Sequence, residues 1–212
     1  MSEHPARIAV FASGSGSNLQ AIFDHFDGPA FGVAAVALVV SDQIMAGALD
    51  RARARDIPAH HVHHSDIDTM QRLLTTLHID LIALAGYLKF VPAELTRAWR
   101  GRMVNVHPAL LPAFGGPGMY GLRVHAAVIA AGARTSGPTV HFVDDQYDHG
   151  PIIAQQSVPV LPGDSPQSLA ARVLEAEHQL YPRVLAAVAS GDIRLSDGGE
   201  VRGASLASLS SS

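Results

Sequence analysis

An asparagine and a histidine stand close together at the end of an apolar segment, where their side chains could stabilise negative charge on an oxygen. Asn105 and His107 alternate with valines, and Pro108 follows directly. Residues two apart on a β-strand point to the same face, so we expect the amide and the imidazole side by side. Such donors suit charge that develops on a carbonyl oxygen. Taken alone, the pair favours a plainer interpretation, in which both residues bond to the adjacent loop.

A glycine-rich turn near the N-terminus could hold a phosphate group. The residues Ser13-Gly-Ser-Gly-Ser17 follow a short β-branched and aromatic segment, and helical periodicity begins at Leu19. Glycines let the backbone approach an anion, and a helix N-terminus offers N–H groups and a positive dipole end. The turn lacks both the Lys-Ser/Thr ending of a nucleoside-triphosphate loop and the third glycine of a dinucleotide fingerprint. We therefore expect a phosphate monoester, and the alternative is a tight turn with a Ser or Asn cap.

An acidic loop follows a later expected strand and could supply a partner for a histidine. Its carboxylates are Asp144, Asp145 and Asp148. A carboxylate within reach of an imidazole favours the imidazolium form. Taken alone, this segment favours a solvated loop rich in turn residues.

Four histidines, at positions 60, 61, 63 and 64, suggest a metal site at first sight. His61 and His63 could share a strand face. However, neither an acidic residue nor a further histidine lies nearby at the spacing typical of metal ligands. We therefore expect strand-end histidines and no metal.

The elements that must position these groups alternate between strands and helices. Residues 33–40 and 81–85 are nearly continuous apolar segments, typical of parallel strands buried on both faces. Helical periodicity or caps mark the segments near residues 19–26, 46–55, 66–78, 123–131 and 166–180. This alternation predicts a single Rossmann-like α/β domain, with a mostly parallel central sheet and helices on both faces. Ligands bind such sheets at the carboxyl ends of the strands, where the three candidate segments lie.

The C-terminal part of the chain yields two further expectations. Ser165 and Pro166 predict the start of a helix that runs to about Leu180, and Pro182 should break or kink it. We expect the catalytic domain to span residues 1–196, and the Ser/Gly-rich tail at residues 197–212 to be disordered.

The composition narrows the class of protein. The chain has 212 residues, a formal net charge of −4 and no cysteine. This charge gives no electrostatic case for a nucleic acid or an anionic membrane as a partner. The lack of cysteine excludes disulfides, thiolate catalysis and Cys-based zinc sites. We expect a soluble, cytoplasmic protein, because the first residues lack a signal-peptide pattern and residues 33–40 are too few to span a bilayer.

Taken together, these segments resemble the phosphoribosylglycinamide formyltransferases, the folate-dependent glycinamide ribonucleotide transformylases. The resemblance covers about residues 6 to 195. The matching segments are Ser13-Gly-Ser-Gly-Ser-Asn-Leu19, Leu84-Ala-Gly-Tyr-Leu-Lys-Phe-Val91, Asn105-Val-His-Pro-Ala-Leu-Leu-Pro112, Gly137-Pro-Thr-Val-His-Phe-Val143 with Asp148-His-Gly-Pro151, and Glu175-Ala-Glu-His-Gln-Leu-Tyr-Pro182. The third segment is highly specific to folate formyltransferases, and the first and last narrow the resemblance to the purine enzyme.

The resemblance implies an activity. A formyl group would pass from 10-formyltetrahydrofolate, a co-substrate, to the amine of 5-phosphoribosylglycinamide in de novo purine (IMP) biosynthesis. The products would be the N-formyl ribonucleotide and tetrahydrofolate. The resemblance assigns Asn105, His107 and Asp148 as catalytic residues. It implies a monomer or homodimer that uses no metal or tightly bound cofactor and has no nucleic-acid or membrane partner.

The resemblance also implies which residues bind the two substrates. Gly16, Ser17 and Asn18 would hold the phosphate, and Glu177 would contact the ribose. The folate pocket would be lined by Leu88, Lys89, Phe90, Val91 and Asn105.

Four alternatives stay open. A methionyl-tRNA formyltransferase would carry a further basic domain and a formyltetrahydrofolate hydrolase an N-terminal regulatory domain, and we expect neither here. A nucleotide-binding oxidoreductase needs an acid about 20 residues beyond the first strand for the ribose, and only Asp42 is near. A non-catalytic module that binds sugar phosphates would keep the glycine-rich turn, but it would not require Asn105, His107 and Asp148 to converge.

Overall fold

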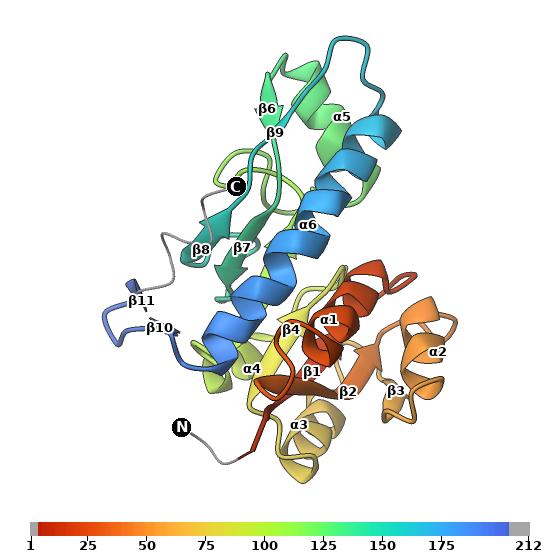
Figure 1. The fold of residues 1–212 in the computed structure, drawn as a ribbon, viewed down its shortest axis with the longest axis vertical. Helices are drawn as coiled ribbons and strands as arrows, with labels where there is room; N and C mark the ends of the chain where they lie inside the picture. Colours follow the sequence, from red (N-terminus) through yellow and green to blue (C-terminus); the bar gives the residue numbers. More distant parts are fainter. Residues whose placement is uncertain (1–3, 204–212) are drawn as a thin grey trace.

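A seven-stranded sheet forms the centre of the molecule, in the order β3-β2-β1-β4-β5-β7-β8 (Figure 1). The computed structural model describes residues 4–203. The strands of this sheet are β1 (Ala6–Phe11), β2 (Ala34–Ser41), β3 (Ala59–His61), β4 (Leu81–Leu84), β5 (Met103–His107), β7 (Thr139–Phe142) and β8 (Ile152–Gln155). The five strands β1 to β5 pair in parallel, whereas β7 and β8 run antiparallel to their neighbours. The predicted α/β fold with a mostly parallel sheet is confirmed.

Helices cover both faces of the sheet, because alternate strand residues point to opposite sides. The helices are α1 (Ser17–Asp27), α2 (Gly47–Arg53), α3 (Ile67–Thr76), α4 (Ala93–Ala98), α5 (Leu122–Ala130) and α6 (Pro166–Ala189). On β1, Ile8 and Val10 pack against α1, α2 and α6, whereas Ala9 and Phe11 face α3 and α4. The boundaries of the other predicted helices lie within a few residues of those expected, but α6 ends later than predicted. The Asp66 side chain caps α3 by accepting from Thr69 N.

The long helix α6 contacts α1, the central sheet and α5. It runs past the sheet and reaches α5, as Figure 1 shows. The sequence predicted that this helix ends near Leu180 and breaks or kinks at Pro182. The predicted end is wrong, because α6 continues past Pro182 to Ala189. Tyr181 is fully buried, and its hydroxyl lies 3.0 Å from the Leu84 carbonyl and 2.9 Å from that of Val104. This anchoring to β4 and β5 outweighs the cost of a proline inside the helix, which is about 3 kcal/mol.

The predicted start of the disordered tail lies too early in the chain. Val201–Gly203 form β11, which pairs antiparallel with β10 (Ile193–Leu195). The prediction is therefore wrong for residues 197–203, and residues 204–212 lie outside the described part of the chain. Residues 152–160 contain two strands, β8 and β9 (Val158–Pro159), and β9 pairs with β6 (Thr135–Ser136).

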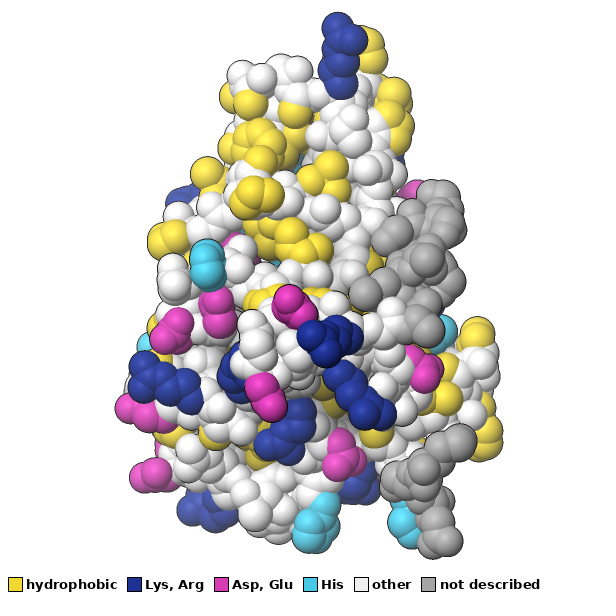
Figure 2. Space-filling model, turned by 90° about the vertical axis from the view of Figure 1, so that its left-hand side faces the viewer, with side chains coloured by type: hydrophobic (Ala, Val, Ile, Leu, Met, Phe, Trp, Pro, Cys, Tyr) yellow, Lys and Arg dark blue, Asp and Glu magenta, His cyan; other side chains and the backbone are white. Residues whose placement is uncertain are grey.

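The surface is mixed in character. On the face in Figure 2, basic and acidic side chains intermingle over the lower half, and hydrophobic side chains gather above them. Within residues 4–203, no helix is long and apolar enough to cross a membrane.

Candidate active site

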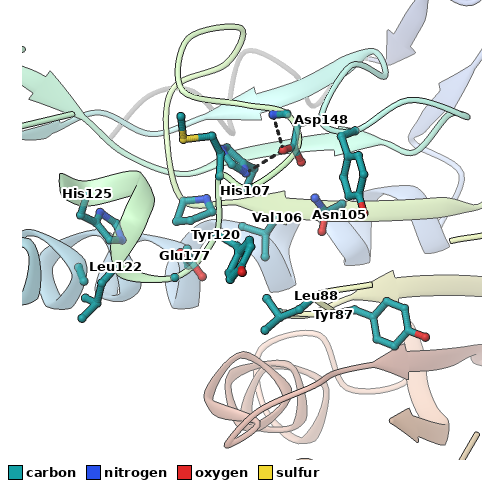
Figure 3. A pocket seen from close by; sticks show the side chains of 18 of the residues that line it. Tyr87, Leu88, Asn105, Val106, His107, Tyr120, Leu122, His125, Asp148 and Glu177 are labelled. Carbon is teal, nitrogen blue, oxygen red and sulfur yellow. Dashed lines mark hydrogen bonds and ion pairs between the residues drawn. The ribbon is translucent and has the colours of Figure 1, made fainter. Parts of the chain in front are cut away.

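A cavity of about 440 Å³ opens at the carboxyl ends of the central strands. Five predicted site residues with polar side chains line it, namely Asn18, Asn105, His107, Asp148 and Glu177. They come from α1, β5, the loop after β7 and α6, so segments far apart in sequence converge here (Figure 3). This position agrees with the rule that open α/β sheets bind ligands beyond the carboxyl ends of their strands.

The side chain of Asn105 is oriented by a histidine on the neighbouring strand. Asn105 and His141 are direct partners in the β5–β7 pairing, and Asn105 Nδ2 lies 3.1 Å from His141 Nε2. His141 Nδ1 donates to the Phe142 carbonyl at 2.9 Å. Burial lowers the pKa of His141, so its Nε2 carries a lone pair and accepts from the amide of Asn105. The second amide hydrogen of Asn105 remains available to a ligand.

His107 is held between a loop carbonyl and a carboxylate. The residue is only 3% exposed, and Nε2 donates to the Phe114 carbonyl at 2.9 Å. Nδ1 lies 3.4 Å from Asp148 Oδ2, which also accepts from Gly116 N at 3.0 Å. Because Nε2 already carries a hydrogen, a neutral ring would turn a lone pair toward the carboxylate. The arrangement is therefore satisfied by an imidazolium paired with Asp148.

Asp148 reaches this position through an unusual backbone conformation. Its φ is 51°, in the left-handed region that Asp and Asn tolerate better than most residues do. Its Oδ1 also lies 3.8 Å from His141 Nε2. One carboxylate thus faces both buried histidines.

Thr139 fixes the turn that follows β5. Its buried hydroxyl donates to the Ala109 carbonyl at 2.7 Å and accepts from Leu111 N at 3.0 Å. Thr139 is also the direct strand partner of His107. The turn that carries the chain away from His107 is therefore held by the antiparallel neighbour strand.

The glycine-rich turn leaves the start of α1 without a side-chain cap. The N-cap residue is Gly16, with φ 77° and no capping side chain, so the alternative of a Ser- or Asn-capped turn is wrong. A Cβ on Gly16 would lie 2.8 Å from Ala48 Cα, so the residue is required for α2 to approach. Arg51 of α2 donates to the Ser15 carbonyl at 2.9 Å and to Gln20 at 3.0 Å, which braces the turn.

The three residues predicted to hold a phosphate occupy different surroundings. Asn18 lines the main cavity, where its Nδ2 donates to Glu177 Oε2 at 2.6 Å. Gly16 packs against α2, and Ser17 borders a separate cleft between α1, α2 and α6. Burial raises the pKa of Glu177 to about 7, although the Asn18 hydrogen bond opposes this shift.

The residues predicted to line a folate pocket lie where two cavities meet. Leu88 lines the main cavity, and Lys89, Phe90 and Val91 line a smaller slot beside it. Both spaces share Asn105 and Asp148. Phe90 and Tyr147 are in ring contact at this slot, with centroids 4.9 Å apart. An aromatic slot that opens next to the amide of Asn105 suits a flat heterocycle that carries the reacting group.

Asp42, the acid that an oxidoreductase would need for a ribose, is occupied within the chain. Its carboxylate accepts from Ser13 Oγ at 2.5 Å and from Gln43 Nε2 at 2.7 Å. Ser13 Oγ also accepts from Leu88 N at 2.9 Å. The acid thus holds together the loops after β1, β2 and β4.

The four histidines on and after β3, at positions 60, 61, 63 and 64, form no set of metal ligands with other described residues. Among residues 4–203, no group of three or more His, Asp or Glu side chains is placed to hold a metal ion. The His63 ring contacts His64, and its Nδ1 lies 2.8 Å from Ser65 Oγ.

His141 is the site residue that the sequence patterns did not single out. It lies within a motif that was recognised, but its contact with Asn105 depends on the register between β5 and an antiparallel β7. The one signal in the sequence was that His141 stands two residues after Thr139 on an expected strand, so the two side chains share a face.

The chain is similar to known proteins over almost its whole length. Residues 6–185 match the formyl transferase family. Two plant relatives are named phosphoribosylglycinamide formyltransferase, chloroplastic. The Arabidopsis thaliana protein is 43% identical and the Vigna unguiculata protein 45% identical, over 91% and 86% of this chain. The chain spans 68% and 60% of their lengths, respectively.

A solved structure agrees in both fold and length. Glycinamide ribonucleotide transformylase 1 from Symbiobacterium toebii superposes with a TM-score of 0.85 and is 37% identical, and the match covers 95% of each chain. Together with the convergence of the motifs on one cavity, these similarities show that the chain belongs to the phosphoribosylglycinamide formyltransferases of the formyl transferase family.

Proposed function

We propose that this protein transfers a formyl group from 10-formyltetrahydrofolate to the amine of 5-phosphoribosylglycinamide, in de novo purine (IMP) biosynthesis. The observation that carries the proposal is the convergence of Asn105, His107 and Asp148 between an uncapped helix N-terminus and an aromatic slot. A phosphate ester suits the first feature and a pterin the second. The reacting amine and formyl group would then meet at the three polar side chains.

Asn105 and His107 would stabilise the oxyanion. As the amine nitrogen bonds to the formyl carbon, charge develops on the formyl oxygen. Asn105 keeps one amide hydrogen free for this oxygen. The Nδ1 hydrogen of His107 is held loosely by Asp148 at 3.4 Å, so the oxygen can share it. One such donor typically contributes about 3–4 kcal/mol in the transition state.

The rest of the reaction moves a proton and breaks one bond. The bond between the formyl carbon and N10 of the folate breaks, the amine gives up a proton and N10 gains one. This transfer would run through His107 or an ordered water beside it. The products are the N-formyl ribonucleotide and tetrahydrofolate. Because an amide and an imidazolium supply the stabilisation, the proposal needs neither a metal nor a tightly bound cofactor.

The substrate contacts in the proposal follow the order of groups in the ribonucleotide. The phosphate would bind at Gly16, Ser17 and Asn18, and the ribose would contact Glu177. The folate would lie against Leu88, Lys89, Phe90 and Val91 and reach Asn105 with its formyl group. We also propose a cytoplasmic monomer or homodimer.

An absorbance assay for loss of the formyl group from a 10-formyl folate tests the proposal. Turnover that requires the ribonucleotide supports transfer. Turnover without it would identify a hydrolase, and no turnover in a folded sample would favour a non-catalytic binding module.

A further inference from the structure

His125 is a buried histidine in the wall of the main cavity, and one of its ring nitrogens has no hydrogen-bond partner among residues 4–203. It lies on α5 and is only 4% exposed, and it lines the cavity. Its Nδ1 is buried and makes no hydrogen bond within residues 4–203. Nearly all buried polar groups are hydrogen-bonded, so an unpartnered ring nitrogen in a residue that lines a cavity points to a ligand as its partner.

The wall that contains His125 is built from two packed helices. Val128 of α5 packs against Leu169 and Val173 of α6, which fixes the two helices side by side. His125 then lines the same cavity as Glu177 of α6. Figure 3 shows both residues toward one end of the cavity and Asn105 toward the other, with His107 between them. The end with His125 is thus separate from the place where the formyl group would react.

The chemistry of this end favours a hydroxyl group over a phosphate. Burial lowers the pKa of His125, and the nearby His107 lowers it further, so the ring is neutral. A neutral imidazole offers one donor and one acceptor, which matches a hydroxyl group. The other titratable group on this wall, Glu177, offers a carboxyl, and the α6 neighbours Ala170 and Leu174 are apolar. A phosphate at this end would face the carboxyl of Glu177, and neither His125 nor Ala170 and Leu174 of α6 would supply a cation.

We infer that His125 binds a ribose hydroxyl of the ribonucleotide beside Glu177, and that it makes the site selective for ribose over deoxyribose. The inference rests on the proposed function for the identity of the ligand. The order of phosphate, sugar and amine in the ribonucleotide also supports a sugar at this place. If the phosphate lies at the start of α1 and the amine at Asn105, the sugar lies between them, near Glu177, which Asn18 of α1 contacts.

The test measures equilibrium binding of glycinamide ribonucleotide and its 2′-deoxy and 3′-deoxy analogues by calorimetry, without folate. The wild type should bind the ribonucleotide about tenfold more tightly than at least one deoxy analogue, the size expected for a single buried hydrogen bond. His125→Phe keeps a ring but removes both nitrogens, and it should lose this discrimination. His125→Gln restores a polar group and should recover part of it.

Two further measurements separate the inference from a structural effect and from the proposed function. Val124→Ala alters the fully buried neighbour on α5 that does not line the cavity, and it should keep the wild-type discrimination. In turnover, His125→Phe should raise KM for the ribonucleotide and leave kcat and KM for the folate unchanged. If His125→Phe discriminates as the wild type does, or if the wild type does not discriminate, the inference is wrong. Discrimination by a wild type without turnover would support the inference and overturn the proposed function.

Discussion

Asn105 donates an amide hydrogen to Nε2 of His141, its direct partner across two antiparallel strands, at 3.1 Å. The other ring nitrogen of His141 is held by the carbonyl of the next residue, Phe142. The two bonds leave the amide of Asn105 one orientation, with its second hydrogen free. A donor held in place before the reaction need not reorganise as charge develops, which is the source of its catalytic effect.

Removal of His141 should therefore lower kcat, because His141 orients the amide of Asn105. We expect His141→Leu to reduce kcat by roughly 10- to 100-fold, part of the loss typical of a missing oxyanion donor, with KM for both substrates little changed. Steady-state kinetics measure this. His141→Gln provides an acceptor for the Asn105 amide and should recover part of the rate. Equal rates for the Leu and Gln variants would contradict the positioning role.

Asn105 and His107 themselves should act on turnover more than on affinity. Asn105→Ala and His107→Ala are each expected to lower kcat by about 10²- to 10³-fold, because each removes one donor to the oxyanion. Binding of the ribonucleotide, measured without folate, should change little. Turnover near that of the wild type in either variant would refute the role assigned to that residue.

The glycine-rich turn offers a matched pair of substitutions. Gly16 has φ 77°, and a Cβ there would lie 2.8 Å from the α2 backbone at Ala48. Gly16→Ala should destabilise the fold by at least about 2 kcal/mol and raise KM for the ribonucleotide. At Gly14 an added Cβ meets no atom within 4 Å, so Gly14→Ala should be mild. Denaturant unfolding and kinetics compare the two, and equal effects would count against a specific need for glycine at position 16.

Glu177 should make stability depend on pH. Its pKa rises from an ordinary 4.5 to about 7 in the fold, mainly through burial. Between these values the folded state keeps a proton that the unfolded chain has released. Protonated Glu177 therefore makes its full contribution to the free energy of unfolding below pH 4.5. This contribution, about 3 kcal/mol in all, is lost as pH rises through about 7. Glu177→Gln lacks this titration.

Urea unfolding of the wild type and Glu177→Gln from pH 4.5 to 8 measures the effect. The wild type should lose stability relative to the variant as pH rises, and other titrating groups cancel in the difference. Parallel curves would show that Glu177 titrates at its ordinary value.

Local patterns predicted the parts of the site that depend on local geometry. Two-residue spacing placed Asn105 and His107 on one strand face, and the alternation of elements predicted the sheet that brings them to Asp148. His141 required knowledge that β7 pairs antiparallel with β5, which no local pattern carries. Pro182 was misjudged because the burial of Tyr181 against the sheet, a tertiary contact, outweighs a local preference.

The most direct test of the central claim follows an isotope-labelled formyl group from 10-formyltetrahydrofolate by NMR, in the presence of glycinamide ribonucleotide. The account predicts that the label appears as a formamide on the ribonucleotide amine at the rate of folate turnover, and that Asn105→Ala and His107→Ala slow its appearance. Label released as formate by the wild type, or formamide formed equally fast by both variants, would contradict formyl transfer at these residues.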